Sequence, residues 1–344
     1  MTTHFLGTTF TTDSQWHTDE VNLISNVKNQ IEKKYPNTEN LLINTTWFGP
    51  QFSNSGYFDL PKFYKKINNL FFLASVDAVM LNADQLATIE LDLGVERTFY
   101  LGNFDTDHQF TFISTLLPTY FRCHTSTDLK SIKYLFIAYN RKPREHRVAF
   151  VKKLIDLQLD KLGIVSLGND DSNIYSNNNL KITLNEQPND YAKEGNWNMG
   201  NPFGVPHDIH SLGNMDYWNH HFLNIVGETE FLPWDNMFIT EKTWKPILGL
   251  RPFILNGQTK IYKYLRDNGF YTFNHYWPHI EMEDLNEIEV HDSMISVIKF
   301  LSKLSDDEIM SMYSDMLPAL EHNRNRFFEF VQEQKYKIDH LFAI

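Results

Sequence analysis

The sequence predicts an α/β protein built from two Rossmann-like domains, of which the C-terminal one is the more regular. At 344 residues the chain is about twice the length of a typical single domain. It is 42% hydrophobic and 22% charged, which excludes disordered, collagen-like and low-complexity proteins. From residue 133 onward, short apolar runs alternate with helical patterns, as in a parallel sheet covered on both faces.

The first 130 residues are irregular in pattern, with aromatic and Asn/Thr-rich stretches between short apolar runs. Residues 41–48, 71–81 and 97–104 read as strands or strand-bearing segments. We expect this part, residues 1–130, to form an α/β domain.

The second half predicts strands and helices in alternation. A buried strand at 134–139 is followed by a helix at 143–161, and residues 164–167 and 181–184 are the next strand candidates. A polar loop spans 185–214. The elements expected after it are a strand at 222–226, a helix at 240–250, a strand at 252–255, a helix at 259–268 closed by Gly269, and a strand at 270–273.

The C-terminal tail reads as helical. Ser305 and Glu308 form a capping box at the start of one helix, and Pro318 is expected to begin a second. We therefore expect a second domain at 131–304, followed by helices at 305–344.

Charge and cysteine content restrict the partners and the compartment. The chain has 43 Asp and Glu and 31 Lys and Arg, which gives a formal charge of −12. This charge disfavours nucleic acid as a partner, unless basic residues are concentrated in one groove. The single cysteine, Cys123, excludes a disulfide framework and favours a cytoplasmic protein. No signal peptide is visible, and the most apolar stretch, 70–81, is too short to span a bilayer.

The segment 139–147 places four cations after a buried strand, within a loop and the first turn of the next helix. Positive side chains are electrostatically unfavourable at a helix N-terminus, unless an anion binds there. Open α/β sheets also place ligands at the carboxyl ends of their strands. This segment therefore predicts a phosphate site, the alternative being a solvated basic turn. Its candidate ligands are Asn140, Arg141, Lys142, Arg144 and Arg147.

The segment 226–247 repeats this arrangement. Glu228 ends an apolar strand, and Thr240 is a good N-cap that places Glu241 and Lys242 in the first helical turn. A carboxylate beside a lysine can hold a ribose diol and a phosphate together, with Lys245 one turn further on. The alternative is ordinary capping with a surface Glu/Lys pair. Pro246 is expected to kink this helix.

Together these two segments resemble the donor-binding half of the fucosyltransferase-like GT-B glycosyltransferases. The matching features are Arg141 after the first strand, Glu228 at the end of the second, the Thr240-Glu241-Lys242 helix entry, and an apolar strand that closes in Gly257. The resemblance covers about a third of the chain, residues 134–257. The sequence departs from the family pattern in the Thr-Glu after Glu228, where the family usually has Asn-Ser, in the loop before Phe238, and in Pro246.

The resemblance implies a GT-B fold, with an acceptor-side domain at 1–130, a donor domain at 131–304 and the helices at 305–344 packing back across the cleft. It also implies an inverting, metal-independent transfer of a sugar from a nucleotide-diphosphate sugar to a glycan or other hydroxyl acceptor, with no further cofactor. Arg141 and Lys242 would neutralise the diphosphate leaving group, and the carboxylates would hold ribose or sugar hydroxyls. A carboxylate of the N-terminal domain would act as general base. The candidates for that base are Asp13, Glu20, Asp59, Asp77, Asp84, Asp105 and Asp107.

Other interpretations stay open. Asp105 and Asp107 resemble the metal-binding Asp-x-Asp of GT-A transferases, and a non-catalytic nucleotide- or glycan-binding module is a third possibility. Neighbouring histidines could bind zinc, although surface or substrate contacts fit them better, and several tryptophans could stack on sugars or belong to the core. These residues are His207, His210, His220, His221, Trp197, Trp218, Trp234 and Trp277. The donor sugar, the base, the acceptor and the oligomeric state are left undetermined.

Overall fold

The computed structural model describes the chain in segments. They are residues 3–6, 15–44, 67–74, 95, 97–102, 111–112, 129–140, 143–167, 212, 215–229, 231, 239–277 and 287–339. The chain divides into two compact units, each with its own parallel sheet. Unit 1 comprises Met1–Phe121, Asp235–Phe238 and Val331–Ile344, and unit 2 comprises Arg122–Trp234 and Ile239–Phe330.

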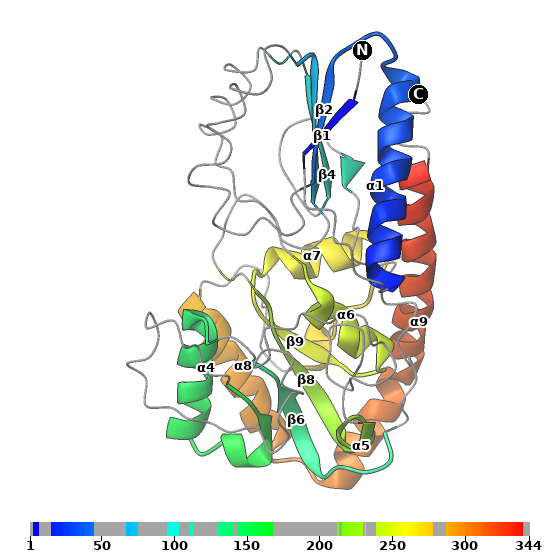
Figure 1. The fold of residues 1–344 in the computed structure, drawn as a ribbon. Helices are drawn as coiled ribbons and strands as arrows, with labels where there is room; N and C mark the ends of the chain where they lie inside the picture. Colours follow the sequence, from blue (N-terminus) through cyan, green and yellow to red (C-terminus); the bar gives the residue numbers. More distant parts are fainter. Residues whose placement is uncertain are drawn as a thin grey trace. The chain divides into compact units, whose positions relative to one another are not determined.

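Unit 1 contains a five-stranded parallel sheet in the order β1-β2-β3-β4-β5, drawn in blue to cyan in Figure 1. Helix α1 (Gln15–Lys34) contacts β1 and β2 and buries Val27 and Ile31. The strand order follows the chain order, so it lacks the reversal of a Rossmann sheet among the described strands. The strands are β1 (Thr3–Leu6), β2 (Asn40–Asn44), β3 (Asn69–Ala74), β4 (Arg97–Gly102) and β5 (Thr111–Phe112).

Unit 2 contains a four-stranded parallel sheet in the order β7-β6-β8-β9. Buried apolar residues fill these strands, as expected for a sheet covered on both faces. The chain moves from β6 outward to β7 and then returns past β6 to β8, so the strand order reverses between β6 and β8. The strands are β6 (Tyr134–Ala138), β7 (Gly163–Val165), β8 (His221–Gly227) and β9 (Phe253–Asn256).

Helices cover this sheet. Helix α4 (Glu145–Asp156) contacts α8 (Glu287–Leu301), which also contacts β9, and the two helices lie together in Figure 1. Helix α6 (Glu241–Leu248) contacts β8 and packs through Trp244 against phenylalanines of α9 (Asp306–Asp339). The remaining helices are α5 (Met215–His220), α7 (Lys260–Asp267), and the 3₁₀ turns η4 (Asp160–Leu162) and η5 (Asn274–Tyr276).

The structure confirms the strands expected near residues 134–139, 222–226 and 252–255, within one or two residues. It also confirms the capping box, because the Ser305 amide donates to Glu308 and the Glu308 amide donates to the Ser305 hydroxyl. The strand expected at 181–184 lies outside the described residues. The described part of the chain contains no helix that has both the length and the apolar character needed to cross a bilayer.

Three expectations about helices and strands are wrong. Helix α4 ends at Asp156 because Gln158 takes a positive φ of 56°, and the amides of Gln158 and Leu159 turn back to the carbonyls of Ile155 and Leu154. Pro318 does not begin a new helix. It lies inside the continuous α9, whose buried apolar face outweighs the one backbone hydrogen bond that a proline removes.

The third error is the strand expected at 270–273, which is irregular backbone. Side chains of α9 bond this part of the chain in place of a neighbouring strand. The Asn323 side chain accepts from the Tyr271 amide at 2.7 Å and donates to the Tyr271 carbonyl at 2.9 Å. His322 and Arg326 bond the carbonyls of Gly269 and Asn268 just before it.

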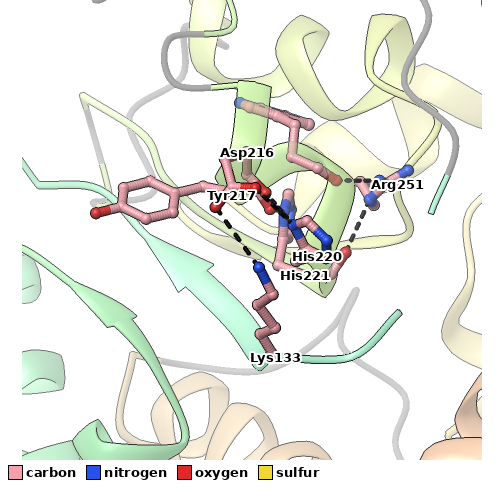
Figure 2. Close-up of polar contacts among 7 residues, drawn as sticks. Lys133, Asp216, Tyr217, His220, His221 and Arg251 are labelled. Carbon is pink, nitrogen blue, oxygen red and sulfur yellow. Dashed lines mark hydrogen bonds and ion pairs between the residues drawn. The ribbon is translucent and has the colours of Figure 1, made fainter. Parts of the chain in front are cut away.

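A buried guanidinium joins the segments at the opposite, amino-terminal edge of the sheet of unit 2. Arg251 is 0% exposed and donates to the carbonyls of His221, at 2.8 Å, and of Trp218. It also donates to the carbonyls of Gly249 and Leu250, which directly follow α6, and to the hydroxyl of Tyr313. Figure 2 shows Arg251 beside His221, with Asp216, His220 and Lys133 nearby.

A tight contact between α5 and α6 lies beside Arg251. A Cβ at Gly249 would come within 2.3 Å and 2.5 Å of the indole ring of Trp218, which is 1% exposed. Only glycine therefore lets this tryptophan pack so closely against the end of α6.

Candidate functional site

The candidate site lies at the carboxyl edge of the sheet of unit 2, where the strand order reverses between β6 and β8. Open α/β sheets bind ligands in the crevice at such a reversal. Polar residues end or follow each of the four strands here: Asn140 after β6, Ser166 after β7, Glu228 after β8 and Asn256 in β9. All four are buried.

Asn140, which follows β6, contacts the ends of both neighbouring strands, β7 and β8. The Asn140 amide donates to the Ser166 hydroxyl at 2.9 Å, and the Asn140 side chain donates to the Ala138 carbonyl at 3.3 Å. Its Oδ1 lies 2.4 Å from where a Cβ of Gly227 would stand. Glycine at position 227 therefore lets Asn140 lie against the end of β8.

Glu228 is the centre of the site, and its carboxylate accepts hydrogen bonds from four protein donors. Oε1 accepts from the Thr240 amide at 3.2 Å and the Thr243 hydroxyl at 2.6 Å. Oε2 accepts from the Thr229 amide at 3.1 Å and the Thr240 hydroxyl at 2.6 Å. Because two carboxylate oxygens offer about four acceptor positions, these bonds saturate the group. Glu228 thereby fixes the start of α6 against the end of β8.

The backbone of the same residue joins β8 to the first turn of α4. The Glu228 carbonyl accepts from Arg147 Nη2 at 2.8 Å and Nε at 3.2 Å, and it lies 3.0 Å from His146 Nε2. Since a carbonyl can only accept, this nitrogen of His146 is the donor. Arg147 also donates to the Gly227 carbonyl at 2.9 Å. One residue thus links both segments that the sequence singled out.

Lys242 is the second residue of α6 and is hydrogen-bonded to Thr240. Thr240 caps the helix by accepting from the Lys242 amide at 3.4 Å, and the same hydroxyl accepts from the Lys242 ammonium at 3.1 Å. The ammonium also lies 3.4 Å from the Thr229 hydroxyl. Lys242 is half-buried. The lysine is therefore held at the junction by two threonines that Glu228 itself bonds.

A group of aromatic rings lies beside this junction and contains two buried histidines. Phe231 lies 5.3 Å from His146 and 5.6 Å from His291 of α8, between ring centroids. Nε2 of His291 lies 3.0 Å from Oδ1 of Asn256, at the end of β9.

Both histidines are held neutral. Burial, reinforced by Arg147 and Arg144, lowers the pKa of His146 to about 3, and the bond to the Glu228 carbonyl only partly opposes this. Burial and Lys153 lower the pKa of His291 to about 4. At neutral pH each imidazole therefore has one donor and one acceptor nitrogen.

The other predicted site residues divide into two groups. Arg144 is the half-buried N-cap of α4, and Lys245 is half-buried in α6. Glu241 is described only through its backbone, as the first residue of α6. Outside the described residues lie Arg141, Lys142, Asp105, Asp107, His207, His210, Trp197 and Trp234.

For two residues the structure shows a role other than the ligand contact expected from the sequence. Glu228 is 0% exposed with every acceptor position occupied, so its carboxylate organises the loop in place of binding a ribose. Arg147 is 2% exposed, and the contacts described for its guanidinium are with the backbone carbonyls of residues 227 and 228. Both residues build the site.

Sequence reasoning missed His146, His291, Asn256 and Thr243. His146 stands inside the basic segment, and Thr243 is one residue past Lys242, so both were adjacent to identified motifs. His291 and Asn256 carried no local signal. Of the tryptophans considered as sugar platforms, Trp218 and Trp277 are buried.

Of the candidate zinc histidines, His220 and His221 bond backbone carbonyls of α5. Nδ1 of His220 lies 2.7 Å from the Asp216 carbonyl, and Nδ1 of His221 lies 2.9 Å from the Tyr217 carbonyl (Figure 2). Within the described segments, no three His, Cys, Asp or Glu side chains gather as a metal site requires.

Comparison with protein-family models, with curated proteins and with solved structures found no match to this chain.

Proposed function

We propose that this chain is a glycosyltransferase that binds a nucleotide-diphosphate sugar at the carboxyl edge of the sheet of unit 2 and transfers the sugar to a hydroxyl acceptor. The observation that carries the proposal is the junction at Glu228. It brings the start of α4 and the start of α6 together where the strand order reverses. The family resemblance of these two segments supplies the reaction class.

The charges at this junction suit a diphosphate. The first turns of α4 and α6 direct backbone N–H groups and the positive ends of two helix dipoles toward one edge of the sheet. Lys242 is anchored there, and Arg141 and Lys142 stand in the chain between Asn140 and the start of α4. As the sugar bond breaks, the departing nucleoside diphosphate gains negative charge, and preorganised cations and amides stabilise it.

The proposal assigns the remaining chemistry to unit 1, in a GT-B arrangement of two domains. A carboxylate of that unit would take the proton of the acceptor hydroxyl, with Asp105 and Asp107 as the leading candidates. The sugar would be transferred with inversion, and the cations would provide the stabilisation that a metal provides in GT-A enzymes.

The test begins with donor binding. GDP-, UDP- and dTDP-sugars are added separately, with a CMP-sugar, which carries a single phosphate, as the comparison, and the melting temperature is measured. A donor at about 100 times its dissociation constant stabilises the native state by about 2.7 kcal/mol, which shifts the midpoint of a domain of this size by roughly 5–10 °C. If none of the three diphosphate classes shifts the midpoint, the proposal fails.

Turnover of the bound donor then separates the alternatives. Release of nucleoside diphosphate in EDTA supports the proposed reaction, release that requires Mn²⁺ supports a GT-A-type mechanism, and binding without release supports a non-catalytic module. Lys242→Ala is expected to lower kcat by about 10²–10³, as for the loss of one preorganised stabilising group. Lys263→Ala, which removes an exposed lysine paired with Asp267 on α7, is the matched control and leaves kcat unchanged.

A further inference from the structure

We infer that Glu228 and Thr240 form a positioning relay that aims the Lys242 ammonium at the donor diphosphate, an inference that rests on the proposed function. Glu228 does not itself contact the donor. It acts through the threonine hydroxyl, which it orients toward the lysine.

The hydrogen bonds of the Thr240 hydroxyl fix its direction. A hydroxyl has one proton and two acceptor positions. Its proton is donated to Glu228 Oε2 at 2.6 Å, which leaves both acceptor positions for other donors. The Lys242 amide takes one of them at 3.4 Å, and the Lys242 ammonium takes the other at 3.1 Å. The hydroxyl is thereby saturated in one orientation.

The two threonines that contact the Lys242 ammonium, Thr229 and Thr240, are both bonded to Glu228. The ammonium also lies 3.4 Å from the Thr229 hydroxyl, and the Thr229 amide donates to the same Oε2 of Glu228 at 3.1 Å. Both threonines that contact the ammonium are therefore fixed by one carboxylate. Because Glu228 is fully buried and each of its oxygens has two donors, it has no second arrangement available at low cost.

An ammonium that is fixed in advance should increase kcat. A lysine side chain has four rotatable bonds and loses much conformational freedom when it binds a phosphate. An ammonium already held at the helix entry has lost that freedom before the donor arrives, so its charge stabilises the leaving diphosphate without reorganisation. A relay that fails should therefore lower kcat and leave KM nearly unchanged.

The structure provides a matched pair of variants. Thr240→Val and Thr243→Val each remove one 2.6 Å hydrogen bond to Glu228, from a buried threonine, with nearly the same change in shape. Of the two removed hydroxyls, the Thr240 hydroxyl is the one that contacts Lys242 in the bonds described. A purely structural role for Glu228 predicts similar effects, whereas a relay predicts a difference.

The first experiment measures the reactivity of Lys242 without any donor. Wild type and variants are treated with an amine-acylating reagent, and modification of Lys242 is followed by mass spectrometry. Loss of a hydrogen bond to a charged group should raise the rate about tenfold in Thr240→Val. Thr243→Val should match wild type, and Thr240→Ser should restore protection. Should Thr240→Val not fold by circular dichroism, Thr240→Ala takes its place.

The second experiment measures kcat and KM with the donor sugar that stabilises the wild type. Thr240→Val should lower kcat by about tenfold or more, and by clearly more than Thr243→Val does. Thr240→Val should add little to the loss caused by Lys242→Ala because the two act as one unit. Equal kcat and equal Lys242 reactivity in the two valine variants would overturn the relay while donor turnover still stood. Absence of turnover in the wild type would overturn the proposed function, and the acylation rates would still decide whether the relay exists.

Discussion

Unit 2 should lose stability in mild acid, because the two histidines beside the Phe231 ring must be neutral in the native state. His146 and His291 have native pKa values of about 3 and about 4, below the ordinary value of 6.5. In the unfolded chain both bind protons near pH 6.5. Below that pH the unfolded state therefore holds more protons than the native state, and the free energy of unfolding falls as pH falls.

The size of the effect follows from these values. Each histidine costs about 1.4 kcal/mol per pH unit between its unfolded and its native pKa. From about pH 7 to about pH 4.5 the two together remove roughly 5 kcal/mol, a large part of the stability of a typical domain. Below pH 3 the native histidines also protonate, and the slope from these two groups vanishes.

The assay is urea denaturation followed by tryptophan fluorescence between pH 7 and pH 4.5. His146→Gln and His291→Gln remove the titrating ring and keep a side-chain N–H that can donate to the Glu228 carbonyl or to Asn256. Each variant should remove about half of the pH-dependent loss attributed to the pair. His322→Gln, at an exposed histidine of α9, is the surface control. A double variant with the same pH dependence as the wild type would refute the assignment of these histidines.

Three further predictions concern packing, backbone bonding and metal. Gly249→Ala places a methyl group against the Trp218 ring and should destabilise unit 2 by about 1–3 kcal/mol in urea denaturation, with partial recovery in a Trp218→Phe background. Asn323→Leu leaves the amide and carbonyl of Tyr271 without their partner and should cost about 1–3 kcal/mol, whereas Asn323→Asp keeps the acceptor and should cost less; equal stabilities would contradict this. EDTA should leave donor turnover unchanged, and Asp107→Asn should abolish turnover with the donor thermal shift intact if Asp107 is the general base; full activity removes it from the candidates.

The central strands of unit 2 could be predicted because strands buried on both faces read as short, continuous apolar runs between helical patterns. The segment 270–273 shows why this reasoning fails elsewhere. Its aromatic pattern is typical of a strand, but its backbone partners are side chains of α9, about fifty positions later in the chain. A local pattern does not report such a partner.

The position of the candidate site was predictable, whereas the role of each residue in it was not. A glutamate at the end of an apolar strand marks the ligand edge of a sheet, and Glu228 is there. Whether its carboxylate faces a ligand or the protein depends on Thr229, Thr240 and Thr243, whose donors occupy it. Arg147 is a similar case, because only the fold brings the end of β8 within reach of its guanidinium.

Arg251 makes the amino edge of the sheet in unit 2 sensitive to acid as well, through its neighbour His221. The described bonds of Arg251 end on carbonyl oxygens and a tyrosine hydroxyl, none of which gains a proton in mild acid. Burial and the permanent charge of Arg251, however, lower the pKa of His221 well below its ordinary value. A proton added to His221 would place two positive charges where the end of α5 meets the start of β8. Acid should therefore loosen both edges of the sheet, and amide hydrogen exchange around Glu228 and around Arg251 should accelerate together as the pH falls below the ordinary histidine pKa.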